Sequence, residues 1–279
     1  MTASAKTGSA KMVRAGKHML SVTVFGHGGP AVVIEPSFGG WAGDWRAIAE
    51  PLASDTTVVT YDRAPYGESG RARDRRTPGD IAADLHAALA ALDITGPVVL
   101  VGHSLGGMYV RKYAALYPAG VAGMVLVESS HEGQKPLLDK VFTTRTKLLG
   151  LLLYPQVIFS TRKGREGADR YSLLREWVTS ERITADEKPL APGALGETPL
   201  IVLTRADGGP FGGKQWALWN DFHAEQAQLS VNNRHVYSDS TDHYLNHGDP
   251  ALVTAAIREV VRSARTGTPV RDLAGEASL

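Results

Sequence analysis

Four continuous apolar runs constrain the fold more than any other feature of this sequence. They are "TVVTYD", "VVLVG", "GMVLVE" and "PLIVLT", each of strand length and without alternation of apolar and polar residues. Uninterrupted apolar strands are typical of a parallel sheet that is buried on both faces. Helical patterns separate the runs, so the alternation predicts an α/β protein with a mostly parallel, doubly wound sheet.

Two segments carry the start signals of helices that would cover such a sheet. In "TPGDIAADLHAALAALD", Thr77 is a candidate N-cap and Pro78 suits the first helical position. A second pair of this kind, Asp249 and Pro250, opens the helix "ALVTAAIREVVRSA". Nearer the N-terminus, the stretches "HMLSVTVFG" and "AVVIE" are separated by "HGGP", which predicts a hairpin.

One interval is too long for a simple crossover between neighbouring strands. About seventy residues separate "VLVESSH" from "PLIVLT", and they contain further apolar helical patterns. We interpret residues 133–195 as a helical cap inserted into an α/β core made of residues 17–132 and 196–265. Residues 1–16 and 266–279 are predicted to be flexible termini.

Composition narrows the classes of partner. Lys and Arg number 30 against 29 Asp and Glu, so no overall electrostatic field favours nucleic acid or an anionic membrane. No apolar run is long enough for a membrane span, and the first residues lack the apolar core of a secretory signal. The absence of cysteine excludes thiol nucleophiles, thiolate metal sites and disulfides. We expect a cytoplasmic protein with a small-molecule partner, and the sequence leaves the oligomeric state open.

A serine between two glycines follows one of the buried runs. In "VVLVGHSLGG", Ser104 stands where a strand turns sharply into a helix, with Gly102 and Gly106 two residues away on either side. Small neighbours are needed there because a Cβ would collide within the turn. The turn presents the hydroxyl at a helix N-terminus, where backbone N–H groups can stabilise an oxyanion. Ser104 is therefore predicted to be the nucleophile of an acyl transfer.

Together with this motif, three other segments resemble the α/β-hydrolase family, in particular its cap-bearing serine esterases and lipases. They are "VVIEPSFGGWAGDW", similar to the oxyanion loop, "YDRAPYGES", similar to the Asp-Arg-Gly-Ser segment, and "STDHYLNHGDP", similar to the C-terminal histidine loop. The resemblance covers about Lys17 to Arg265. It implies the α/β-hydrolase fold and a reaction that requires no cofactor.

The resemblance also implies roles for individual residues. The oxyanion donors would be the backbone N–H groups of Leu105 and Phe38, although Ser37 stands where the family usually has glycine. His243 occupies the family's position for the general base, a role that neutral imidazole suits. No metal site is expected at the histidine loop, because it lacks the glutamate of a zincin motif. In "YDRAPYGES", Asp62 and Arg63 are expected to hydrogen-bond the backbone of turns around the site.

Two carboxylates compete for the role of triad acid, which fixes the tautomer of the base. Asp207 follows "PLIVLT", the commonest position in the family, but "TRADGG" lacks the usual leading glycine and its aspartate comes one residue early. Glu128 ends the preceding strand, and some branches, haloalkane dehalogenases among them, resemble this chain in using that position. We favour Glu128, with Asp207 as the alternative.

These features predict a serine hydrolase that cleaves a carboxylic ester or a related acyl compound through an acyl-enzyme intermediate. The apolar composition of the cap favours a small lipophilic acyl substrate. C–C bond hydrolysis of a diketone and cofactor-free peroxidase chemistry would use the same residues. A non-catalytic ligand-binding receptor is the alternative from another class, and the intact nucleophile and base argue against it.

Overall fold

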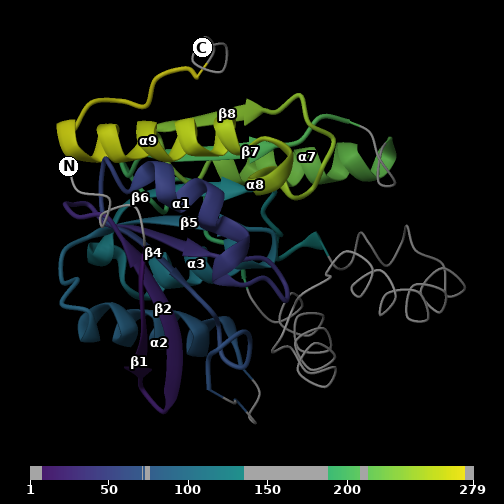
Figure 1. Cartoon of the computed structure of the whole chain (residues 1–279). Helices are drawn as coiled ribbons and strands as arrows, with labels where there is room; N and C mark the ends of the chain where they lie inside the picture. Colours follow the sequence, from purple (N-terminus) through teal and green to yellow (C-terminus); the bar gives the residue numbers. More distant parts are fainter. Residues whose placement is uncertain (1–7, 71, 73–75, 135–187, 208–212, 274–279) are drawn as a thin grey trace, which may run out of the picture.

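The computed structural model describes residues 8–70, 72, 76–134, 188–207 and 213–273. Across these residues the chain forms a sheet with the strands β1 (Ser9–Ala15), β2 (His18–Phe25), β3 (Val32–Glu35), β4 (Val58–Tyr61), β5 (Val98–His103), β6 (Val121–Val127), β7 (Leu200–Thr204) and β8 (Asn233–Tyr237). The strands lie in the order β1-β2-β4-β3-β5-β6-β7-β8 (Figure 1). The ladders of β2 with β1 and β4 are antiparallel, and the remaining ladders are parallel. The predicted α/β class with a mostly parallel sheet is confirmed.

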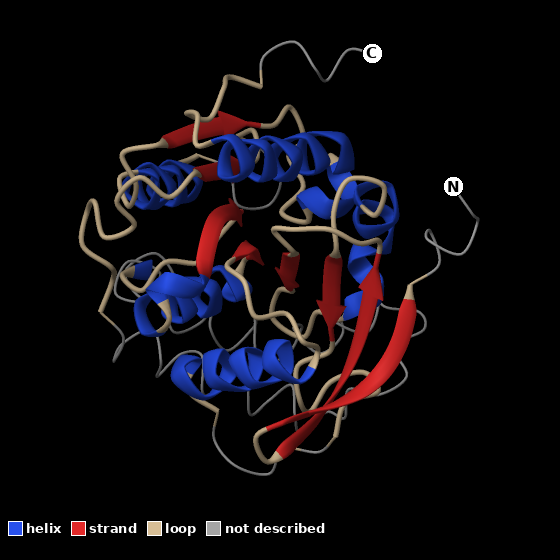
Figure 2. Ribbon diagram, turned by 90° about the vertical axis from the view of Figure 1, so that its left-hand side faces the viewer, coloured by secondary structure: helices blue, strands red, loops and turns tan. Residues whose placement is uncertain are grey.

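Helices cover both faces of this sheet (Figure 2). The α-helices of the described segments are α1 (Arg46–Leu52), α2 (Pro78–Ala91), α3 (Leu105–Leu116), α7 (Lys214–Ala227), α8 (Leu245–Gly248) and α9 (Pro250–Thr266). Buried side chains from both α2 and α3 contribute to one hydrophobic core, and those of α1 and α9 contribute to another on the opposite face. Along β5, Val98 and Leu100 join the first core, whereas Val99 and Val101 join the second. The apolar run is continuous because successive side chains point to opposite faces and both faces are buried.

The two helices predicted from N-cap signals begin where the sequence indicates. The Thr77 hydroxyl accepts a hydrogen bond from the backbone N–H of Asp80 at 3.2 Å, and Pro78 is the first residue of α2. The Asp249 carboxylate accepts one from the backbone N–H of Leu252, also at 3.2 Å, at the start of α9. Each cap satisfies a backbone N–H that has no partner within its helix, a contribution of about 1 kcal/mol.

The predicted hairpin between "HMLSVTVFG" and "AVVIE", which form β2 and β3, is wrong. β2 pairs with β1 and with β4, and β4 separates it from β3. β3 instead lies between β4 and β5 and is parallel to both. The glycines and proline of "HGGP" mark the end of one strand and the start of another, but turn residues alone do not determine which strands pair.

The folded part of the chain extends further than predicted towards both termini. Residues 9–15, assigned above to a flexible terminus, form the edge strand β1. Most of its side chains are exposed, which hides the strand pattern in the sequence. After α9, Val270 and Leu273 are buried in the core with α1 and α9, and the Glu259 carboxylate accepts hydrogen bonds from Arg271.

The predicted helical cap, residues 133–195, falls mostly on residues 135–187, which lie outside the described part of the chain. The described residues 188–195 lead into β7, and Leu190 and Leu195 pack partly buried against the core with α2 and α3. Within the described ranges, no helix is both long enough and apolar enough to cross a lipid bilayer.

Candidate active site

Ser104 lies in the sharp turn between β5 and α3. Its backbone has φ 53° and ψ −121°, a conformation that residues with a side chain rarely adopt. A Cβ at Gly102 would lie 2.6 Å from Cγ2 of Val110, and a Cβ at Gly106 would lie 2.4 Å from the backbone oxygen of Glu35. The turn therefore requires glycine on both sides of Ser104, as the sequence predicts.

His243 connects the serine to a buried carboxylate. Its Nε2 lies 3.0 Å from Ser104 Oγ, and its Nδ1 lies 3.1 Å from Glu128 Oε2. Because an ionised carboxylate only accepts hydrogen bonds, Nδ1 carries the proton and Nε2 can accept the proton of the serine hydroxyl. The loop after β8 thus brings His243 next to residues that follow β5 and β6.

Glu128 stands one residue beyond β6 with a positive φ of 45° and a side chain that is fully buried. Its Oε1 accepts a hydrogen bond from the backbone N–H of Arg205 at 2.8 Å, and its Oε2 accepts one from Trp219 Nε1 at 3.1 Å. Burial raises the pKa of this carboxyl, but the hydrogen bond from His243 and the other donors outweigh burial, so the pKa lies below its ordinary value. The carboxylate is consequently ionised beside the imidazole.

The alternative acid, Asp207, is exposed and lies on the loop after β7. Its Oδ1 accepts a hydrogen bond from the backbone N–H of Gly213 at 3.0 Å. Of the two carboxylates weighed from the sequence, Glu128 is the one that the structure places in hydrogen-bond contact with His243.

Two further histidines lie beside Glu128 and His243. Nε2 of the buried His103 donates to the backbone oxygen of His243 at 2.9 Å, and burial lowers the pKa of His103 to about 3. His223, also buried, lies with Nδ1 3.9 Å from Glu128, and burial lowers its pKa to about 4. Its Nε2 donates to the backbone oxygen of Ser129 at 3.1 Å, so Nδ1 accepts the hydroxyl proton of Thr204 at 2.6 Å. Both rings are therefore neutral at neutral pH.

The loop after β3 lies against the start of α3. Phe38 packs against a small apolar cluster that contains Leu105, and the close approach of Gly106 to the backbone of Glu35 described above joins the two segments. The predicted oxyanion donors thus come from adjoining parts of the structure. The backbone N–H of Gly40 donates to the Ser37 oxygen at 2.8 Å, which closes the loop into a turn.

The "YDRAPYGES" segment bonds the backbone of nearby turns, as the sequence predicts. Asp62 accepts hydrogen bonds from the backbone N–H groups of Ala42 at 2.8 Å and Glu68 at 3.0 Å. Arg63 donates to the backbone oxygens of Pro36 and Ser37. These contacts attach the segment after β4 to the loop that carries Phe38.

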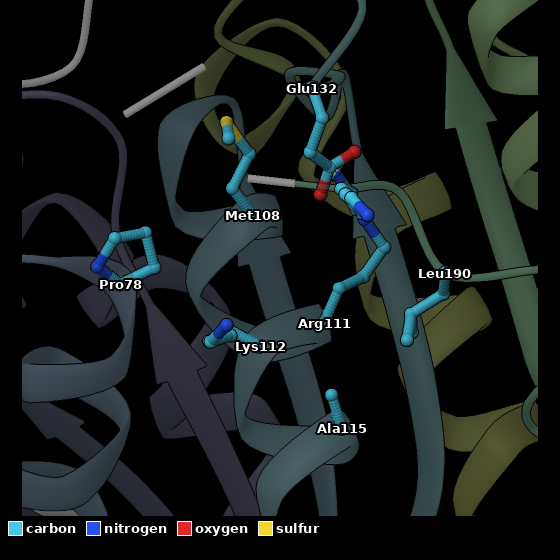
Figure 3. Close-up of a pocket in the computed structure, with 8 residues that line it drawn as sticks. Pro78, Met108, Arg111, Lys112, Ala115, Glu132 and Leu190 are labelled. Carbon is cyan, nitrogen blue, oxygen red and sulfur yellow. Dashed lines mark hydrogen bonds and ion pairs between the residues drawn. The ribbon is translucent and has the colours of Figure 1, made fainter. Parts of the chain in front are cut away.

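A small cavity lies beside α3 (Figure 3), and its lining residues do not include Ser104, Glu128 or His243. Its volume is about 50 Å³, whereas pockets for organic ligands usually enclose at least about 300 Å³. The Arg111 guanidinium and the Glu132 carboxylate meet on its wall at 2.9 Å, and both side chains are buried. The cavity is too small for an acyl substrate, and two of its charged groups, Arg111 and Glu132, neutralise each other. It is lined by Pro78, Met108, Arg111, Lys112, Ala115, Glu132, Lys188 and Leu190.

Sequence reasoning missed Arg205 and Trp219, which contact the Glu128 carboxylate directly, and His223, which lies 3.9 Å from it. Arg205 carries a usable signal, because a charged residue directly after the buried run "PLIVLT" lies at the edge where the strands of a parallel sheet end. Trp219 and His223 lie on α7 and carry no comparable signal in the sequence. Among the described residues, no group of three or more His, Asp or Glu side chains is arranged to hold a metal ion.

Comparisons with known proteins agree with this architecture. A family model described as the alpha/beta hydrolase fold matches residues 30–249. An AB hydrolase superfamily protein of Gibberella zeae is 24% identical over 85% of this chain and 87% of its own length. A thermophilic esterase from Thermogutta terrifontis has a TM-score of 0.65 at 21% identity, covering 93% of this chain and 100% of the esterase. A serine hydrolase involved in carbazole degradation, the CarC enzyme, has a TM-score of 0.65 at 18% identity, covering 92% of this chain and 99% of that enzyme.

Proposed function

The chain belongs to the α/β hydrolase fold family and is a hydrolytic enzyme, and from this premise we propose that it is a serine hydrolase that cleaves carboxylic esters or related acyl compounds. The observation that carries the proposal is the chain of contacts from Ser104 Oγ to His243 at 3.0 Å and from His243 to Glu128 at 3.1 Å. A nucleophile, a base and a group that orients the base stand in the order that acyl transfer requires.

The reaction then proceeds through an acyl-enzyme. Ser104 Oγ attacks the acyl carbonyl carbon while His243 Nε2 takes the hydroxyl proton. When the tetrahedral intermediate collapses, the bond to the leaving alkoxide breaks and His243 returns the proton to it. Water, deprotonated by the same Nε2, attacks the acyl-enzyme and releases the acid and the free serine. Throughout, Nδ1 keeps its proton and donates a hydrogen bond to the Glu128 carboxylate, whose charge stabilises the imidazolium.

The negative charge that develops on the carbonyl oxygen needs hydrogen-bond donors. We assign them to the backbone N–H of Leu105, at the positive end of α3, and to that of Phe38. The packing of Phe38 against the cluster of Leu105 supports this assignment, because both donors must reach one oxygen.

Aromatic side chains near these groups favour a lipophilic acyl substrate of small or medium size. Trp41, which follows the oxyanion loop, is 36% exposed, and Tyr244, which follows His243, is 39% exposed. Large exposed aromatic rings provide apolar contact area for a ligand. C–C bond hydrolysis and cofactor-free peroxidase chemistry would use the same triad, so substrate assays must decide among these reactions.

The test combines a covalent probe with a substrate panel. A fluorophosphonate should label wild-type protein at Ser104, found by mass spectrometry of the labelled peptide, and should fail to label folded Ser104→Ala. Wild-type protein should hydrolyse p-nitrophenyl esters of graded acyl length, and Ser104→Ala should reduce kcat by several orders of magnitude. If Ser104→Ala keeps more than about a tenth of wild-type kcat, nucleophilic catalysis by Ser104 is wrong.

A further inference from the structure

A buried arginine lies directly behind the loop that carries Phe38. Arg63 is 2% exposed and its partner Glu35 is 0% exposed. Arg63 Nη1 donates to Glu35 Oε1 at 2.5 Å and to the backbone oxygen of Pro36 at 2.6 Å, while Nη2 donates to the backbone oxygen of Ser37 at 2.8 Å. One planar guanidinium thus contacts three consecutive residues, Glu35 to Ser37.

The contact at Ser37 bears on the proposed oxyanion donor, because the Ser37 carbonyl and the Phe38 N–H belong to the same peptide unit. This peptide bond is trans, so its N–H points away from its carbonyl oxygen. The oxygen accepts hydrogen bonds from Arg63 Nη2 and from the backbone N–H of Gly40, both at 2.8 Å. Two donors on the carbonyl fix the plane of the peptide and therefore the direction of the Phe38 N–H.

The charge of the guanidinium has a second effect on that N–H. A charge-assisted hydrogen bond to the carbonyl oxygen polarises the peptide unit, which strengthens its N–H as a donor. The effect is large where water is excluded, and both Arg63 and Ser37 are buried.

Further contacts surround the Arg63–Glu35 ion pair, and those of Tyr61 are with Glu35. The Tyr61 hydroxyl donates to Glu35 Oε2, and burial together with the Glu35 charge raises the pKa of Tyr61 well above its ordinary value, so the phenol keeps the proton that it donates. The guanidinium carbon lies 5.1 Å from the centre of the Tyr109 ring and 5.7 Å from that of Tyr66. Arg63 is thus fixed from several sides.

We propose that Arg63 is a positioning residue for the reaction, which aims and polarises the Ser37–Phe38 peptide so that its N–H stabilises the oxyanion. The inference rests on the proposed function, because Phe38 is an oxyanion donor only if Ser104 attacks a carbonyl. Arg63 touches no reacting atom and acts through the peptide that it holds.

The test compares Arg63→Lys with Tyr61→Phe. Lysine keeps the positive charge beside Glu35 but cannot reproduce the planar fork that holds both loop carbonyls. We expect Arg63→Lys to reduce kcat about 10- to 100-fold with KM changed less than about threefold, because the interaction is made in the transition state. Its affinity for a boronic acid, which forms a tetrahedral adduct with the serine, should fall in parallel. Tyr61→Phe removes one hydrogen bond to Glu35 and leaves the loop contacts of Arg63, so kcat should stay within about threefold of wild type while the melting temperature falls.

The outcomes separate the inference from the proposed function. If wild-type protein is not labelled at Ser104 and hydrolyses no ester, both are wrong. If wild-type protein is labelled and active but folded Arg63→Lys keeps its kcat or its boronic acid affinity, Arg63 has a structural role alone and only the inference is wrong. If Arg63→Lys does not fold, the double variant Glu35→Gln/Arg63→Gln replaces it, because two amides leave no unpaired buried charge. The same loss of kcat and boronic acid affinity is then expected, and its absence contradicts the inference.

Discussion

Arg205 Nε lies 3.3 Å from Oε2 of Glu128, the same carboxylate oxygen that accepts the hydrogen bond from His243. The two side chains are 6% and 0% exposed, so their attraction is little screened by water. A permanent cation at this place favours the ionised carboxylate, which the imidazolium would need as a partner in the proposed reaction. In the proposed mechanism, this oxygen therefore faces both the fixed charge of Arg205 and the charge that His243 gains when it takes the serine proton.

The first prediction distinguishes the two candidate acids. Glu128→Gln removes the negative charge and favours the wrong imidazole tautomer, so kcat should fall by about 10⁴, the size of the corresponding effect in a serine protease triad. Asp207→Asn should lower kcat less than about tenfold, since Asp207 is exposed and bonds the Gly213 N–H. Ester turnover and circular dichroism of both variants provide the measurement. A larger loss in Asp207→Asn would reverse the assignment, and equal large losses would mean that both carboxylates position His243.

The second prediction concerns the indole that bonds Glu128. Trp219→Phe keeps the aromatic ring but removes the N–H that lies 3.1 Å from Oε2, so the carboxylate loses a donor and kcat should fall about 3- to 10-fold. Trp216→Phe is a matched control on the same helix, because its indole donates to the Arg205 backbone oxygen at 3.0 Å and not to the carboxylate. We expect a smaller effect on kcat from this variant. Equal kcat values in the two variants would show that the Trp219 hydrogen bond does not contribute.

Sequence and structure agree best where a residue's role is local. The N-caps at Thr77 and Asp249 depend on neighbours within three residues, and the glycines around Ser104 on a single turn, so all could be predicted. The pairing of β2 with β4 could not be predicted, because the residues of a turn do not determine which distant strand pairs with the strand before it. The hydrogen bond from Trp219 to Glu128 could not be predicted for the same reason, since the two residues are 91 positions apart in the chain.

The third prediction follows from the buried His223. Burial lowers its pKa from 6.5 to about 4, so between these values the unfolded chain binds a proton that the folded protein does not. Above pH 6.5 His223 is neutral in both states, and the free energy of unfolding is at its highest. As the pH falls from 6.5 towards 4, the unfolded chain takes up the proton and the free energy of unfolding decreases. We expect this histidine to remove about 2 kcal/mol of stability at pH 5 relative to neutral pH.

Urea unfolding at pH 7 and pH 5 measures the effect of His223. In His223→Gln, whose amide does not titrate, the difference between the two unfolding free energies should be smaller than in wild type by about the same 2 kcal/mol. His103 contributes in the same direction in both proteins and cancels in the comparison. If this pH difference is the same in wild type and in His223→Gln, the prediction is wrong, because the pKa of His223 would then be similar in the folded and unfolded chains.

The fourth prediction tests the close approach between α3 and the oxyanion loop. In Gly106→Ala the new Cβ would lie 2.4 Å from the Glu35 oxygen and 2.6 Å from the Pro36 oxygen, and neither backbone atom can turn aside as a side chain would. The start of α3 must then move away from the loop, which separates the N–H groups of Leu105 and Phe38. Because a displacement of about 1 Å at a reacting site can cost about 100-fold, we expect kcat to fall about 10- to 100-fold and the affinity for a boronic acid to fall with it.

Gly79→Ala is the matched control for Gly106→Ala. Gly79 also lies in the first turn of a helix, but its Cβ would meet Thr77 Oγ1 at 3.6 Å and Lys112 Cε at 3.8 Å, which are ordinary contacts. Alanine there should leave kcat unchanged and raise the unfolding free energy by up to about 1 kcal/mol, because glycine loses more backbone entropy on folding. If Gly106→Ala folds and keeps a kcat equal to that of Gly79→Ala, the spacing between the two donor segments does not limit the reaction. If instead kcat falls while the boronic acid binds as tightly as in wild type, the loss arises at Ser104 itself and the oxyanion assignment has no support from this variant.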